Sequence, residues 1–114
     1  MKLSYEGIGQ WAATFACTGV SEGSVVKVGA NGTVSACAAG EAFCGTVSSV
    51  SHGGEACSVV LGGLVTAAYS GIAPTLGYGG LSADGQGGVK ADTSGRSYLI
   101  VDMDTGTKTV TFVL

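Results

Sequence analysis

The chain has 114 residues, of which 46% are apolar, 11% are charged and 21 are glycines, and its formal net charge is −3. Its few lysines and arginines are scattered rather than clustered, so we expect no nucleic-acid ligand. It has no run of 18 apolar residues, so we expect no membrane-spanning segment, and its length predicts one domain.

Residues 1–22 are predicted to form an extended arm ahead of a single β-domain over residues 23–114. The arm carries apolar side chains that follow no regular period: Tyr5, Ile8, Trp11, Phe15 and Val20. One short strand is predicted near residues 14–17, the alternative being an edge strand packed on the body. The first residues lack the apolar core of a secretory signal, so we expect no export and reduced thiols.

The stretch from Gly23 to Gly63 is predicted to hold four strands. Two runs rich in β-branched residues flank Asn31-Gly32, a strong hairpin signal because both central residues of a type I′ turn need positive φ. Two further runs begin near Phe43 and Ala56, with glycines between them. No helical period competes with these strands.

A further strand is predicted over residues 64–69, and Pro74 marks a turn. The remainder resembles the first block at an offset of about 54 residues. Residues 77–85 match 23–32, Val89 follows as Val34 does, residues 98–102 match 43–47, and residues 109–114 match 56–61. We interpret this as two pseudo-repeated halves, the alternative being chance similarity between strand–turn patterns.

Together these elements predict an all-β fold, namely a small antiparallel β-barrel or sandwich of short strands with an extended N-terminal arm. The low charge indicates that other subunits cover part of the surface. The alternative is a surface of serine, threonine and glycine that needs few charges.

Two motifs suggest nucleophilic chemistry, and neither has the required context. Gly19-Val20-Ser21-Glu22-Gly23 matches the G-x-S-x-G elbow, which needs a helix after the serine, whereas a predicted strand follows. His52 lies in a predicted hairpin loop without an evident nucleophile or orienting acid. We therefore expect a polar turn, an exposed histidine and no enzyme.

Two groups of residues suggest metal sites. Cys37, Cys44, His52 and Cys57 are spaced too widely for paired zinc ligands, so these cysteines and Cys17 are expected to act as small hydrophobic residues. The segment from Asp102 resembles the start of a calcium loop, but its twelfth position is Val113 rather than an acid. We therefore expect a hairpin turn there, and neither metal nor cofactor.

The order of these runs resembles the capsid decoration, or cement, proteins of tailed bacteriophages. The resemblance is carried by glycine turns and strand patterns in three segments: Gly23–Val34, Gly40–Val47 and Gly54–Gly63. It covers about 90 residues, including a second strand with an Asp-Gly turn before two closing strands. The departures are the three cysteines after residue 23, where Val, Ala or Ile is expected, and Gly23-Ser24 in place of Gly-Asp.

The resemblance implies a structural protein of the virion on the outer capsid surface, assembled in the cytoplasm of a bacterial host. It would bind the major capsid protein, stabilise contacts between capsid subunits and form a homotrimer. Aromatic residues tend to dominate interfaces, so Tyr5, Ile8, Trp11 and Phe15 are the predicted anchor. Ordinary core packing is the alternative for Trp11 and Phe15.

Two other classes of function remain open. A non-enzymatic carbohydrate- or surface-binding module could stack sugars on Tyr69, Tyr78 or Tyr98. A cysteine nucleophile would need an accessible, electropositive site, and few cations lie near the cysteines in sequence.

Overall fold

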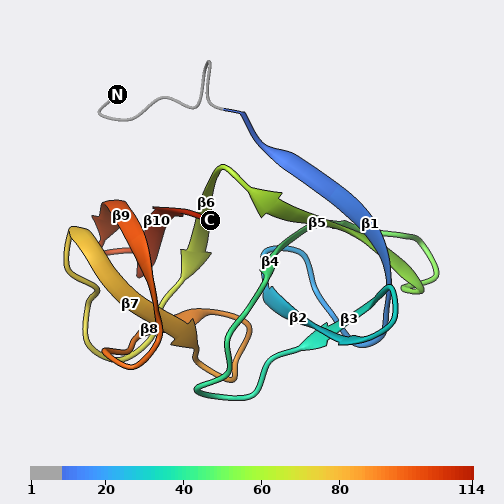
Figure 1. Cartoon of the computed structure of the whole chain (residues 1–114), viewed down its shortest axis with the longest axis horizontal. Helices are drawn as coiled ribbons and strands as arrows, with labels where there is room; N and C mark the ends of the chain where they lie inside the picture. Colours follow the sequence, from blue (N-terminus) through green and yellow to red (C-terminus); the bar gives the residue numbers. More distant parts are fainter. Residues whose placement is uncertain (1–8) are drawn as a thin grey trace.

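The structure, a computed structural model, describes residues 9–114 and confirms the all-β class (Figure 1). All its regular elements are strands: β1 (Trp11–Cys17), β2 (Val25–Ala30), β3 (Thr33–Ala36), β4 (Gly45–Val50), β5 (Ala56–Gly62), β6 (Leu64–Ala68), β7 (Gly77–Ala83), β8 (Val89–Ala91), β9 (Arg96–Asp104) and β10 (Thr109–Val113). Within residues 9–114, no helix is long and apolar enough to cross a membrane.

The first five strands close into a barrel in the order β1-β3-β2-β4-β5, with β5 returning to β1. All its neighbouring strands are antiparallel except β1 and β3, which pair in parallel at Ala16↔Thr33 and Cys17↔Val34. The predicted antiparallel barrel therefore contains one parallel pair. Parallel neighbours need a connection longer than a hairpin turn, and β2 lies within that connection.

The last five strands form a second sheet in the order β6-β10-β9-β7-β8. Read from β1 in the other direction, the closed barrel runs β1-β5-β4-β2-β3, and adding five to each strand number gives the order of the second sheet. This agreement confirms the two pseudo-repeated halves. Tyr69, just after β6, forms a single parallel bridge with Val89 in β8, at the place where β1 and β3 pair in the barrel. A single bridge thus stands where the barrel has a strand pair, and the second sheet is open between β6 and β8.

Strand pairing also fixes the register of the repeat. Val47 lies opposite Val59, and Ile100 lies opposite Phe112, so Ile100 takes the place of Val47. The sequence match had placed Asp102 there and was wrong by two residues in this strand. Side chains alternate with a period of two, so such a slip keeps every side chain on its face and leaves the pattern unchanged.

A shared core joins the halves. Phe43, between β3 and β4, stacks on Tyr98 with ring centroids 5.2 Å apart and meets Phe112 edge-on at 5.9 Å. This core cluster also takes Val25 and Val60 from the barrel. A second cluster, which includes Val26, Val34 and Val59, lies within the barrel alone.

Two local expectations need correction. Residues 11–17 are neither a separate arm nor an edge strand, because β1 has a hydrogen-bonded neighbour on each side. The Asn31-Gly32 hairpin is present, but its type is wrong: Gly32 has φ of 60°, while Lys108 is the non-glycine residue with positive φ in residues 9–114. A register shift between Val28 and Ala30 accommodates this turn, so a single positive φ is enough.

Candidate binding surfaces

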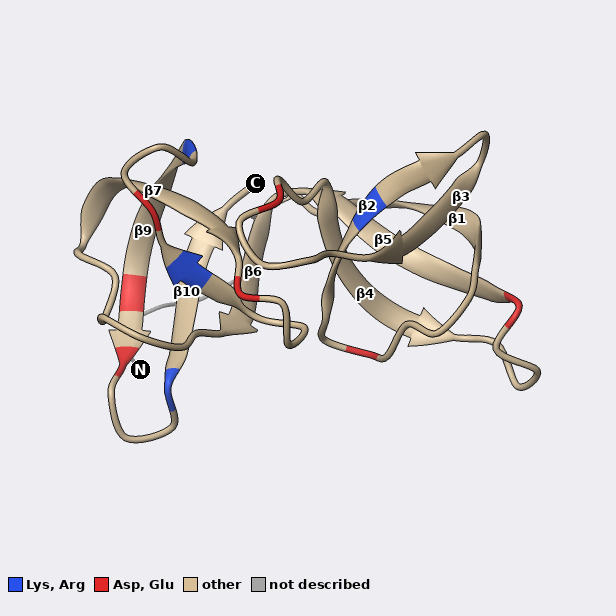
Figure 2. Ribbon diagram, turned by 90° about the horizontal axis from the view of Figure 1, so that it is seen from below, with Lys and Arg blue, Asp and Glu red and all other residues tan. Residues whose placement is uncertain are grey.

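Charged side chains are distributed over both halves of the molecule (Figure 2). Among residues 9–114, the ion pair is Lys27 with Glu41, at 2.7 Å between Nζ and Oε1. The Lys27 hydrogen bond and the amide of Ala38 lower the pKa of the exposed Glu41 carboxyl. Such exposed pairs contribute little to stability, so recognition of a partner would depend mainly on uncharged groups.

Large apolar side chains are exposed at several points of the surface: Trp11, Val28, Ile72, Leu76, Tyr78 and Val113. Three of them lie in or beside the connection from β6 to β7, where Ile72 is 84% exposed and Tyr78 79% exposed. This group, Ile72, Leu76 and Tyr78, is termed the apolar connection below. Exposed apolar groups that lie together are typical of interaction sites.

A hollow of about 370 Å³, the Tyr78 hollow, lies beside the apolar connection. Its lining includes Ile72, Tyr78, Gly80 and Asp92. A Cβ on Gly80 would lie 2.0 Å from the carbonyl oxygen of Asp92, so backbone forms the wall there. The hollow is therefore built by close approach of β7 to the segment after β8.

Asp92 is held as an anion at the edge of this hollow. Its Oδ1 accepts hydrogen bonds from the amide and hydroxyl of Ser94, at 2.9 and 2.6 Å, and its Oδ2 accepts one from the Ser82 hydroxyl at 2.8 Å. These bonds lower the pKa of Asp92 to about 2. The carboxylate therefore keeps its charge at neutral pH.

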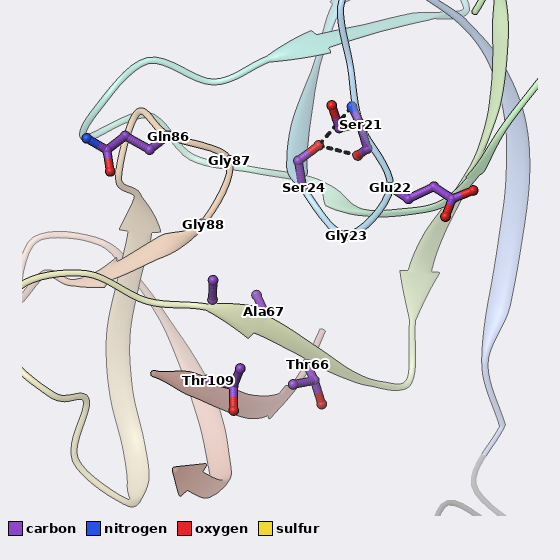
Figure 3. A pocket seen from close by; sticks show the side chains of 11 residues that line it. Ser21, Glu22, Gly23, Ser24, Thr66, Ala67, Gln86, Gly87, Gly88 and Thr109 are labelled. Atoms are coloured by element: carbon purple, nitrogen blue, oxygen red, sulfur yellow. Dashed lines mark hydrogen bonds between the residues drawn. The ribbon is translucent and has the colours of Figure 1, made fainter. Parts of the chain in front are cut away.

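A second hollow, of about 410 Å³, lies between the two halves (Figure 3). Its lining comes from the loop before β2, the β7–β8 turn, β6 and β10, and Glu22 is its only ionisable residue. The Ser24 hydroxyl donates to the Ser21 carbonyl at 2.6 Å. Ser21 thus lies in a polar turn followed by strand β2, and the G-x-S-x-G elbow is not formed.

The other reactive residues form no common site. The four cysteines are free thiols, and His52 is exposed in the β4–β5 turn. In the part of the chain that the structure describes, no three His, Cys, Asp or Glu residues are arranged to hold a metal. Asp104 Oδ1 accepts hydrogen bonds from the amides of Gly106 and Thr107, at 2.8 and 3.3 Å. These bonds stabilise the predicted hairpin turn between β9 and β10.

The predicted anchor residues are not brought together as one described group. Tyr5 and Ile8 lie outside the described residues. Trp11 is 62% exposed and its indole lies against Gly62, where a Cβ would meet Nε1 at 1.9 Å. Phe15 is half-buried against the inner cluster of the barrel. Trp11 is thus available for an interface, whereas Phe15 mainly packs.

The apolar connection was missed by sequence reasoning. Ile72 and Leu76 flank Pro74 in a segment predicted only as a turn, and Tyr78 lies at the next strand. Large apolar residues on both sides of a turn proline were the available signal. No protein-family model matches the chain, and no curated protein matches it either.

Proposed function

We propose that this protein is a structural component of a tailed-bacteriophage virion that binds the outer capsid surface and stabilises contacts between major capsid subunits. The observation that carries the proposal is the set of exposed apolar side chains on a β-body with 11% charged residues. The likeness of Gly23–Val34, Gly40–Val47 and Gly54–Gly63 to capsid decoration proteins supports it. No catalytic role and no cofactor are part of the proposal.

Two surfaces would meet neighbouring subunits. Trp11, at the start of β1, is the exposed one of the two anchor residues that the structure describes, and Tyr5 and Ile8 precede it in the chain. The apolar connection offers a second contact. Because a capsid presents many copies of the same site, modest contacts at each copy are sufficient for stable attachment once subunits act together. A homotrimer would supply such multiple contacts.

The test is attachment to particles. Virions of the phage that encodes this chain are purified by density gradient, and the copy number is measured by quantitative mass spectrometry. We expect a fixed ratio to the major capsid protein, and particles lacking the protein should open at lower temperature. Recovery of the protein only as free chains, with particles of unchanged stability, would overturn the proposal.

Matched variants locate the contact. Trp11→Ala removes an exposed ring and should weaken attachment at least tenfold, since truncation of an aromatic hot-spot residue typically costs about 2 kcal/mol or more. Val28→Ala, also at an exposed site of the barrel, is the control and should leave attachment unchanged. Equal binding by both variants would remove Trp11 from the contact.

Sugar binding is a second candidate, favoured by one observation. Of the three tyrosines considered for stacking, Tyr69 and Tyr98 are buried, whereas Tyr78 is 79% exposed beside the Tyr78 hollow and the Asp92 carboxylate. A glycan array tests this candidate. Binding that survives Tyr78→Phe but not Tyr78→Ala would support stacking on the ring, and no binding to any glycan would exclude it.

A further inference from the structure

Cys17 and Cys57 are neighbouring thiols inside the barrel. In the β1–β5 register Cys57 lies opposite Phe15, and Cys17 follows two residues later on the same face of β1. Both belong to the inner cluster of the barrel and are only 5% and 3% exposed. Cys17 Sγ donates to the Gly54 carbonyl at 3.5 Å, and Cys17 lies close enough to raise the pKa of the Cys57 thiol. Both side chains therefore lie on the inner face of the barrel, on adjacent strands and at diagonal positions.

We propose that Cys17 and Cys57 form an oxidation site that closes a cross-strand disulfide between β1 and β5. A disulfide requires Cα atoms about 4.4–6.8 Å apart. Diagonal neighbours in a sheet start slightly beyond this range, so a small approach of β1 to β5 accompanies closure. Because both side chains belong to the same inner cluster, neither has to change face for the bond to form.

The reaction balances with a small disulfide such as oxidised glutathione. One cysteine thiolate attacks the oxidant, forming a mixed disulfide and releasing one glutathione thiolate. The second cysteine thiolate then attacks the protein sulfur of that mixed disulfide, forming the Cys17–Cys57 bond and releasing a second glutathione. The protein thus loses two electrons and two protons, and the oxidant is reduced to two thiols.

A hollow of about 210 Å³, lined by Cys57 together with Thr14 and Ser51, lies beside this strand pair, while Cys57 itself is 3% exposed. The oxidant would therefore reach the thiol when β1 and β5 open locally beside this hollow. Burial, together with the neighbouring Cys17, raises the pKa of Cys57 to about 11. Little thiolate is present at neutral pH, so the reaction is expected to be slow there and faster at higher pH.

The bond would stabilise the barrel after assembly. It would tie Cys17 to Cys57 across most of the first half and reduce the freedom of the unfolded chain. In a reducing cytoplasm the thiols would stay free, and the bond would form after release into oxidising surroundings. This timing, unlike the chemistry, rests on the proposed virion function.

The full chain is incubated with oxidised glutathione at pH 8.5, quenched with acid, unfolded and labelled with N-ethylmaleimide. Mass spectrometry should find two labels fewer than in the reduced protein and a peptide joining Cys17 to Cys57. The melting temperature should rise by roughly 10 °C and fall again with dithiothreitol. Four labels after oxidation, or a bond between any other cysteines, would overturn the proposal.

Variants separate this pair from the other thiols. Cys37→Ser/Cys44→Ser should keep the new bond and the rise in melting temperature, whereas Cys17→Ser should lose both. Loss of the bond in the Cys37→Ser/Cys44→Ser protein would contradict the assignment. Because the readout uses the free chain, failure to bind capsids leaves it unchanged, and the two proposals fail separately.

Discussion

Phe43 joins the two halves at the scale of a single side chain. It lies in the connection before β4, is 5% exposed, and contacts Tyr98 and Phe112 of the second sheet. Tyr98 and Phe112 also meet each other, with ring centroids 5.2 Å apart. Each ring of this cluster therefore touches the other two, and removal of one leaves a void beside both others.

Phe43→Ala should lower the free energy of unfolding by about 3–5 kcal/mol, because it removes buried apolar area and leaves a cavity. Urea denaturation followed by circular dichroism measures the change. Ile72→Ala is the control, since Ile72 is 84% exposed, and should change stability by less than about 0.5 kcal/mol. Similar losses in both variants would show that the ring cluster does not stabilise the fold.

Asp92→Asn should remove a pH-dependent contribution to stability. Hydrogen bonds from Ser94 and Ser82 lower the pKa of Asp92 from 3.8 to about 2 in the folded protein. The unfolded chain therefore takes up the proton first, so the stabilisation is present above about pH 4 and is lost as pH falls toward 2. Melting temperatures of both proteins should differ above pH 4 and converge near pH 2.

Asp102→Asn is the control for this experiment. Asp102 lies on β9, and its carboxylate accepts a hydrogen bond from the amide of the adjacent Met103. Its substitution should not reproduce the convergence seen with Asp92→Asn. A difference between wild type and Asp92→Asn that stays constant down to pH 2 would contradict the assigned role of the Ser94 and Ser82 hydrogen bonds.

At the scale of elements, Gly45 allows β4 to cross close to β5. A Cβ at this position would lie 2.1 Å from the carbonyl oxygen of Val60, which is backbone and cannot rotate away. Gly45→Ala should therefore destabilise the protein by about 3 kcal/mol, the upper part of the range for overpacking. Thermal unfolding followed by circular dichroism measures this loss.

Gly53→Ala is the matched control in the adjoining turn. The nearest heavy atom to a Cβ there is Glu55 Cγ at 3.9 Å, an ordinary contact. This substitution should leave the melting temperature nearly unchanged. An equally neutral result for Gly45→Ala would mean that β4 can move away from β5 at no cost in stability. It would contradict the view that the close approach of these two strands requires glycine at position 45.

Strands were predictable from the sequence because their signals are local. Alternating or β-branched runs and glycine turns indicated most of the strands, including β10, where Val110 and Phe112 face the core. The parallel pairing of β1 with β3 was not predictable, since it depends on closure of the barrel. The start of β1 at Trp11 was also missed, because its pairing with Gly62 lies far away in sequence.

The candidate surface was less predictable, because exposure depends on the whole fold. Tyr69, Tyr78 and Tyr98 all follow or occupy predicted strands, yet only Tyr78 is exposed. Trp11 and Phe15 looked alike in sequence, and the structure exposes the first and half-buries the second. The local sequence pattern thus identified the aromatic candidates, but it could not predict which of these side chains would be exposed and which would be buried.

At the scale of the whole molecule, the halves differ in how far they depend on each other. The barrel has a cluster of its own, whereas the cluster of the second sheet includes Val25, Phe43 and Val60 from the barrel. A fragment of residues 64–114 should therefore lack a cooperative thermal transition when alone. It is also shorter than most chains that fold without a partner or a cross-link.

Mixing the fragment with residues 1–63 should restore the transition, as followed by circular dichroism and by the dispersion of NMR signals. Residues 1–63 alone should keep strand structure at reduced stability, because the inner cluster of the barrel remains. Cooperative unfolding of residues 64–114 by themselves would show that the shared core is not needed for the second half.

Gly63 is the single residue between β5 and β6, and it has φ of 97°. A Cβ there would lie 2.4 Å from the carbonyl oxygen of Gly9, so the link is closely packed as well as short. Two five-stranded bodies that would otherwise have to meet by diffusion are thus held as a permanent pair. Tethering gives each an effective concentration near its neighbour that dilution cannot lower, so their union persists however scarce the protein becomes.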